Sequence, residues 1–104
     1  MAGAQQKPPG KGGLLDKYSP ALFRSWQTRT CEVKDRILKY SKEKNGKLEM
    51  CGVLNFDLYC CYVQKIAGKP QFKITFKGNE REFWFRGASE EDASAWVEVL
   101  TQHI

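Results

Sequence analysis

Apolar and polar residues alternate along most of this chain in short runs that are typical of β-strands. Residues 72–77 are the clearest case, because their apolar members share one side of an extended chain and their lysines and threonine share the other. The pattern predicts seven strands, at residues 14–18, 26–34, 36–40, 50–56, 58–64, 72–77 and 81–86, with loops at 19–25 and 41–47. Short strands joined by short turns favour an antiparallel sandwich or barrel.

The last sixteen residues, 89–104, change to the spacing of an amphipathic helix. Ser89 is suited to cap its start, and the three acidic residues that follow favour the positive end of the helix dipole. One face of this helix carries Ala93, Trp96, Val97, Leu100 and Ile104. The pattern therefore predicts a helix that covers an open sheet or barrel and inserts Trp96 into the core.

The first twelve residues differ from the rest, because they contain Pro8, Pro9 and several glycines but no bulky apolar residue after Met1. Such a segment buries too little surface to offset the entropy of ordering. We expect a flexible tail at residues 1–12 and one domain at residues 13–104. No apolar run is long enough for a signal peptide or a membrane span, which favours a soluble, cytoplasmic protein.

The net charge of +5 is distributed unevenly. Fifteen Lys and Arg residues and six Asp and Glu residues precede Gly78, whereas two and six follow it. A basic strand region beside an acidic helix attracts anionic partners, such as lipid headgroups, nucleic acid or an acidic protein. Nucleic acid is the least favoured of these, because the chain has no recognised nucleic-acid-binding motif.

The residues that carry chemistry are few, and they do not indicate an enzyme. The four cysteines form no C-x-x-C pair and His103 is the only histidine, so we expect no metal site and no cofactor. One terminal histidine does not supply a catalytic triad, and no glycine-rich phosphate loop follows a strand. The sequence therefore predicts a non-catalytic protein.

Several segments, taken in order, resemble the pleckstrin-homology (PH) domain over about residues 13–104. They are Gly13-Leu14-Leu15-Asp16-Lys17, Trp26-Gln27-Thr28-Arg29, Leu38-Lys39-Tyr40, Gly52-Val53-Leu54-Asn55-Phe56, and Phe85-Arg86-Gly87-Ala88 before an acidic helix with Trp96. The resemblance implies a mainly β fold. The implied fold is a bent seven-stranded antiparallel sandwich or barrel, with near-orthogonal sheets of four and three strands, capped by one C-terminal α-helix.

The same resemblance implies a phosphoinositide site at the open end of the barrel. Lys17 and Arg29 match the family's basic positions on the first two strands, while Gln27 and Cys51 stand where strong headgroup binders often have basic residues. The candidate headgroup residues are Lys17, Arg24, Arg29, Lys39, Tyr40 and Lys42. Leu22 and Phe23, in the first loop, are candidates either for insertion into a bilayer or for packing over the end of the barrel.

Two functions remain open from the sequence. In the first, the domain is a peripheral membrane module, a monomer that binds phosphoinositides or other anionic lipids weakly or with broad headgroup choice. In the second, the same fold binds a protein partner and binds little lipid. Only part of the family's set of basic residues is present, which is equally compatible with a headgroup site and with ordinary solvated strands. The positions of Lys17, Arg29 and Lys39 therefore decide between these functions.

Overall fold

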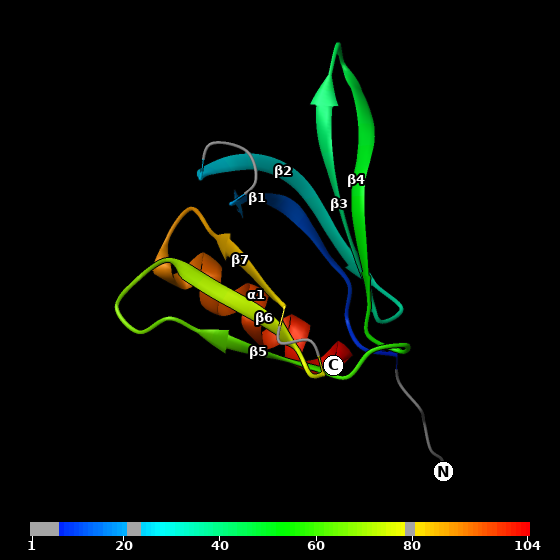
Figure 1. The fold of residues 1–104 in the computed structure, drawn as a ribbon, viewed down its shortest axis with the longest axis vertical. Coiled ribbons are helices and arrows are strands. Elements are labelled where there is room, and N and C mark those ends of the chain that lie inside the picture. Colours follow the sequence, from blue (N-terminus) through cyan, green and yellow to red (C-terminus); the bar gives the residue numbers. More distant parts are fainter. Residues whose placement is uncertain (1–6, 21–23, 79–80) are drawn as a thin grey trace.

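The computed structural model of this chain describes residues 7–20, 24–78 and 81–104, and this part contains seven β-strands and one α-helix (Figure 1). The elements are β1 (Lys11–Ser19), β2 (Ser25–Lys34), β3 (Ile37–Lys44), β4 (Lys47–Asn55), β5 (Cys61–Lys65), β6 (Gln71–Phe76), β7 (Glu82–Arg86) and α1 (Glu90–His103). The strands form one antiparallel sheet in the order β4-β3-β2-β1-β7-β6-β5. This architecture confirms the predicted fold class.

The sheet bends where β1 meets β7. Only two residue pairs join these strands, Asp16 with Arg86 and Lys17 with Phe85. An ion pair of 2.9 Å between Arg86 and Asp16 reinforces the join. The halves β1–β4 and β5–β7 correspond to the predicted sheets of four and three strands, but they are continuous (Figure 1). Because β4 and β5 are the two edges, the sheet stays open between them.

The apolar core lies between the two halves of the sheet and the helix, which packs against β5 and β6. Its most completely buried side chains are Leu15, Cys31, Val33, Leu38, Phe72, Ile74, Phe85, Trp96, Leu100 and His103. Trp96 is only 1% exposed, and its ring lies against Gly13 of β1. Val97 and Ile104 pack at the edge of the same cluster, so the predicted apolar face of the helix is confirmed.

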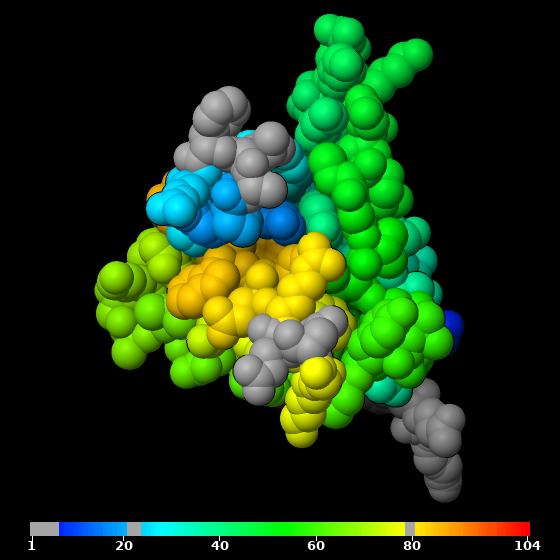
Figure 2. All heavy atoms as spheres, in the orientation of Figure 1, coloured from blue at the N-terminus to red at the C-terminus, as the bar shows by residue number. Residues whose placement is uncertain are grey.

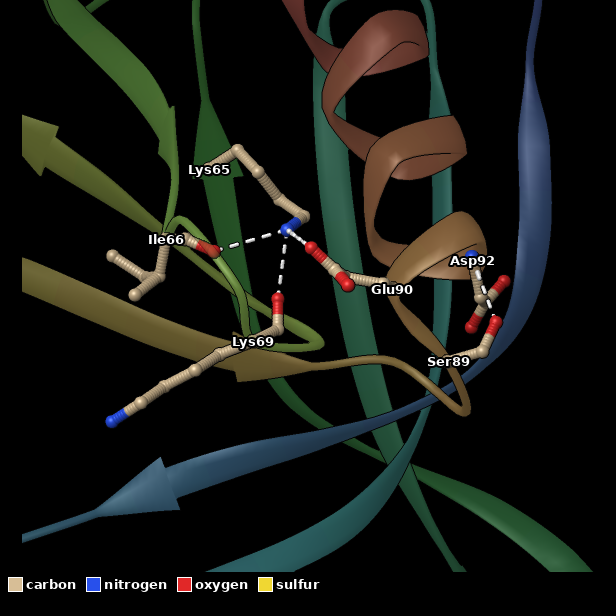
Figure 3. Close-up of polar contacts among 6 residues, drawn as sticks. All are labelled: Lys65, Ile66, Lys69, Ser89, Glu90 and Asp92. Carbon is tan, nitrogen blue, oxygen red and sulfur yellow. Dashed lines mark hydrogen bonds and ion pairs between the residues drawn. The ribbon is translucent and has the colours of Figure 1, made fainter.

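The start of the helix is held by two sets of polar contacts (Figure 3). The Ser89 hydroxyl accepts a hydrogen bond from the Asp92 N–H at 3.0 Å, as expected for an N-cap residue. The Lys65 ammonium donates to the carbonyls of Ile66 and Lys69 and lies 3.4 Å from a carboxylate oxygen of Glu90. These contacts fasten the β5–β6 turn to the first turn of α1.

The predicted strand boundaries are wrong in several places. Strand β1 begins at Lys11, so Lys11 and Gly12 pair with β2 although the sequence pattern left them in the tail. The expected loop at residues 41–47 is mostly strand, because β3 and β4 pair as far as Lys44 and Lys47. Only Asn45 and Gly46 form the turn, both with positive φ, as a two-residue hairpin loop requires. Strand β5 begins at Cys61, three residues later than predicted.

His103 was not expected in the core, yet its side chain is fully buried. One ring nitrogen, Nε2, lies 2.7 Å from the carbonyl oxygen of Pro9, and the other, Nδ1, lies 3.1 Å from the Arg36 N–H. A carbonyl oxygen only accepts, so Nε2 carries the proton and Nδ1 accepts from Arg36. His103 thereby links the helix end to the first described residues and to the β2–β3 turn.

No helix in the described ranges is long and apolar enough to cross a lipid bilayer.

Candidate functional site

The candidate site lies on the inner face of β1, β2 and β3, beyond the end of the apolar core. Strand alternation decides which side chains face inward. On β1 the buried Leu15 and the half-buried Lys17 share a face, and across the ladder Leu15 pairs with Arg29. The inward Cys31 pairs with Tyr40 of β3 in the same way. The register therefore brings together Lys17, Arg29 and Tyr40, three of the predicted headgroup residues.

Aromatic rings form the floor beneath Lys17. Its ammonium lies 5.1 Å from the centroid of the Tyr40 ring and 5.4 Å from that of Phe83, both within the range of cation–π attraction. The Tyr40 ring lies directly over Gly52, where a side chain would overlap the phenol. Tyr40 also meets Phe85 edge to face, with ring centroids 6.5 Å apart. These contacts fix the position of the ammonium at the open end.

Arg81 joins this group from the other half of the sheet. Its guanidinium carbon lies 4.6 Å from the centroid of Phe83, the same ring that Lys17 contacts. Arg81 was missed as a candidate in the sequence analysis. A signal was present, because Arg81 precedes Phe83 by two residues and so shares its inward phase in the predicted last strand.

The charges of the site repel one another. Partial burial lowers the pKa of Lys17, and the positive charges of Arg81 and then Arg29 lower it further. The phenol of Tyr40 is affected mainly by burial, which raises its pKa. A cluster of cations on partly desolvated aromatic rings creates a positive potential. The arrangement is therefore suited to bind a phosphate or another compact anion.

Gln27 and Arg29 form a unit within this site. One terminal nitrogen of the Arg29 guanidinium donates to the carbonyl oxygen of Thr28 at 2.8 Å, and the other donates to the side-chain oxygen of Gln27. Gln27 pairs with Lys17 across the ladder. The glutamine that replaces the expected basic residue thus orients Arg29 instead of adding a charge.

The other predicted site residues are dispersed. Lys39 follows the inward Leu38 and precedes the inward Tyr40, so it points to the opposite face of the sheet, where its neighbours are Glu32 and Val53. The prediction that it joins Lys17 and Arg29 is therefore wrong. The Lys42 side chain faces the same way as that of Tyr40. The register shift beyond Tyr40 leaves one extra residue on β4 and none on β3, so the alternation along β3 continues. Exposed Arg24 lies just before β2, whereas Leu22 and Phe23 lie outside the described residues.

A hollow of about 400 Å³ adjoins the site between β4 and the ends of β6 and β7. Tyr40, Phe83 and Arg81 form part of its wall, so it shares three residues with the cation site. Further wall comes from Tyr59, Phe76 and Lys77. Figure 2 shows the green residues of β4 and its following loop beside the yellow residues of the β6–β7 region on this face.

Replacing Gly52 by alanine is expected to disturb both the cation site and the hollow. The new Cβ would overlap the hydroxyl and ring of Tyr40, and the ring is held on its other side by Phe85 and Lys17. We expect a loss of stability of about 1–3 kcal/mol, the usual result of overpacking, in denaturant unfolding. When Tyr40 is already alanine, Gly52→Ala should cost less stability than it does in the wild type. If the losses of the two single variants simply add in the double variant, the contact between Gly52 and Tyr40 is contradicted.

A family model described as the PH domain matches residues 9–104. The fold is also similar to solved PH domains. The C-terminal PH domain of pleckstrin, solved with D-myo-Ins(1,2,3,4,5)P5, is 18% identical at a TM-score of 0.66, with 86% of this chain and 92% of that chain covered. The Slm1 PH domain, solved with inositol 4-phosphate, is 21% identical at a TM-score of 0.74, with coverage of 89% and 93%.

The N-terminal PH domain of human ARAP2 is 26% identical at a TM-score of 0.67, and the match covers 98% of this chain and 83% of that one.

Proposed function

The chain belongs to the PH domain family, and from that premise we propose that it is a non-catalytic, cytoplasmic module of the membrane periphery that binds acidic lipid headgroups. Lys17, Arg29 and Arg81 bind the headgroup phosphates, with Tyr40 as floor and as a hydroxyl donor. The proposal concerns the shared chemistry of phosphoinositides and other anionic lipids. The domain needs no metal or cofactor for this role.

The observation that carries the proposal is the convergence of Lys17 of β1 and Arg81, which lies just before β7, on the rings of Tyr40 and Phe83. Arg29 of β2 lies close enough for its positive charge to lower the pKa of Lys17. Within the described part of the chain, Lys17 and Arg29 have no carboxylate partner, whereas five other basic side chains form ion pairs. Those five are Lys7, Arg36, Lys65, Lys73 and Arg86. Partly buried cations that repel one another gain free energy when an anion neutralises them.

The ligands of the structural neighbours support the same chemistry. Slm1 was solved with phosphoserine and with inositol 4-phosphate, and the pleckstrin domain with inositol pentakisphosphates. In this chain Gln27 and Cys51 occupy two positions where a strong headgroup site would have cations. We therefore expect weak binding with broad headgroup choice rather than high stereospecificity.

Co-sedimentation with vesicles tests the proposal directly. We expect the full chain to bind phosphatidylcholine vesicles only when they contain a phosphoinositide or phosphatidylserine, with affinity that decreases as salt increases. Soluble inositol phosphates should compete for the site and shift the amide resonances of β1, β2 and β3. Binding to neutral vesicles alone, or no competition by inositol phosphates, would contradict a headgroup site.

Arg81→Ala and Lys39→Ala form a matched pair of variants, since each removes one exposed positive charge. Arg81→Ala is expected to weaken vesicle binding about five-fold, or ~1 kcal/mol, the usual contribution of a basic residue near an anionic surface. Lys39→Ala, on the opposite face, should have little effect at high salt, where long-range attraction is screened. Equal losses in both variants would indicate a diffuse surface charge and no defined site.

A further inference from the structure

Strand β4 combines an unpaired edge with an unusual density of exposed apolar side chains. It pairs with β3 on one side and is the last strand of the sheet on the other. Seven large apolar side chains of the described residues are strongly exposed, and five of them lie on β4 or in the loop after it: Leu48, Met50, Val53, Leu58 and Tyr59. Proteins usually protect such edges with charges or coverings, so this concentration indicates an interaction surface.

The hollow of about 400 Å³ runs along this edge. Residues 52–55 all contribute to its wall, including Val53, which faces outward, and Leu54, which faces inward. Consecutive residues of a strand line one hollow only when the hollow adjoins the backbone edge, because their side chains point to opposite faces. The free hydrogen-bonding edge of β4 and the hollow are therefore parts of one surface.

Aromatic rings give this hollow a rigid apolar floor. Tyr59 meets Phe76 edge to face at 6.1 Å between ring centroids, and Phe76 meets Phe83 at 5.6 Å. The Lys77 N–H donates to the carbonyl oxygen of Cys60 at 2.9 Å, which ties the loop after β4 to the end of β6. A preformed hollow with an aromatic floor is suited to receive one large apolar side chain of a partner.

The charges around the surface select an acidic partner. Lys77 and Arg81 line the hollow, and Lys39 of β3 lies beside Val53 on the outer face of the sheet. Asp57, close to the same edge, is already engaged by Arg36 at 3.1 Å. A second copy of this chain that paired through its own β4 edge would bring the same basic residues together. The charge pattern thus favours an acidic protein segment over self-association.

We propose that an extended acidic segment of a partner protein adds as a further strand to the edge of β4, with one large apolar side chain in the hollow and carboxylates near Lys77, Arg81 and Lys39. Main-chain hydrogen bonds to an open edge supply affinity, and pockets for alternate side chains supply specificity. A strand that alternates acidic and apolar residues supplies both the apolar side chain for the hollow and the carboxylates for the basic residues. This surface shares Tyr40, Phe83 and Arg81 with the cation site, but it does not use Lys17 or Arg29.

Selection from a displayed library of random nine-residue peptides, with the full chain as target, tests the proposal. We expect enriched peptides to alternate acidic with large apolar residues, and synthetic copies to shift the amide resonances of residues 50–55. Copies with lysine in place of the acidic residues, or with proline at the central position, should bind at least about ten-fold more weakly. Proline removes a backbone donor that strand addition needs.

Two pairs of substitutions locate the binding surface. Tyr59→Ser with Lys77→Glu changes two exposed residues of the hollow and should weaken the selected peptides about ten-fold. Tyr62→Ser with Lys69→Glu makes the same chemical changes at exposed positions of β5 and the β5–β6 turn, and it should leave binding unchanged. Lys17→Ala with Arg29→Ala should also retain peptide binding.

Several results would overturn the proposal. These are no enrichment of acidic alternating peptides, equal binding of the proline copies, or equal effects of the hollow variant and its β5 control. A concentration-dependent dimer that the hollow variant abolishes would assign the edge to a second copy of the chain instead. Salt-resistant binding to neutral vesicles that the same variant abolishes would assign the edge to a membrane.

Discussion

Replacing Trp96 by alanine is expected to lower the free energy of unfolding by about 3–5 kcal/mol, the range for a buried Trp or Phe. The side chain is 1% exposed at the centre of the helix face that closes the core, and it lies against Gly13 of β1. The ammonium of Lys11 lies 5.2 Å from the centroid of its ring. Since domains of this size are stable by only about 5–15 kcal/mol, the variant is expected to be largely unfolded or close to its midpoint at 37 °C.

Trp84→Ala is the matched control for this prediction. Trp84 lies half-exposed on the outer face of β7, where its indole N–H donates to Glu82 at 3.2 Å and Lys73 lies over its ring. Its loss removes surface contacts without a cavity in the core, so we expect a much smaller change in denaturant midpoint. Equal destabilisation by the two substitutions would show that Trp96 does not close the core.

The helix could be predicted from the sequence because its signals are local. Ser89, the acidic first turn and the apolar face of α1 are all contained in sixteen residues, and the structure retains each of them. The outer part of the β3–β4 hairpin could not be predicted in this way, because from Glu43 to Met50 both of its strands are exposed on both faces. Such strands show no alternation of buried and exposed residues. They are defined only by their pairing with each other and by the turn at Asn45 and Gly46.

The candidate site was predicted only as far as strand alternation was applied. Lys17 and Arg29 were found because the basic motif of the family marks them. Lys39 was wrongly grouped with its neighbour Tyr40, although adjacent residues of a strand face opposite ways. Arg81 is 64 residues from Lys17 in the chain, and only the bend between β1 and β7 brings them to one ring.

His103 shows a different limit of the sequence pattern. A polar residue next to the end of the chain carries no mark of burial, yet its ring is enclosed because it satisfies two backbone groups. Buried polar side chains are tolerated when they find such partners. Those partners, at Pro9 and Arg36, come from segments distant in the sequence, so no local pattern predicts them.

The double variant Lys17→Ala with Arg29→Ala is expected to show the largest loss of headgroup binding. In the proposed site each side chain would supply a charge-assisted hydrogen bond to phosphate, worth about 1.5–3 kcal/mol. Together they predict a loss of at least about 100-fold in affinity for phosphoinositide vesicles, measured by co-sedimentation or calorimetry. Lys44→Ala with Lys47→Ala removes the same charge from the exposed hairpin end and should cost far less.

Lys17→Ala by itself should not lose stability, and this separates a binding role from a folding role. Folding lowers the pKa of Lys17 from its ordinary value of 10.5, because burial, Arg81 and Arg29 all disfavour the ammonium. The unfolded chain therefore holds this proton more tightly, so the charge opposes folding at neutral pH. That cost is relieved as the pH rises through the folded pKa towards 10.5. Without ligand, we expect the melting temperature of Lys17→Ala to equal or exceed that of the wild type at pH 7, with the difference decreasing at alkaline pH. A lower melting temperature together with retained vesicle binding would show that Lys17 stabilises the fold and that the headgroup site lies elsewhere.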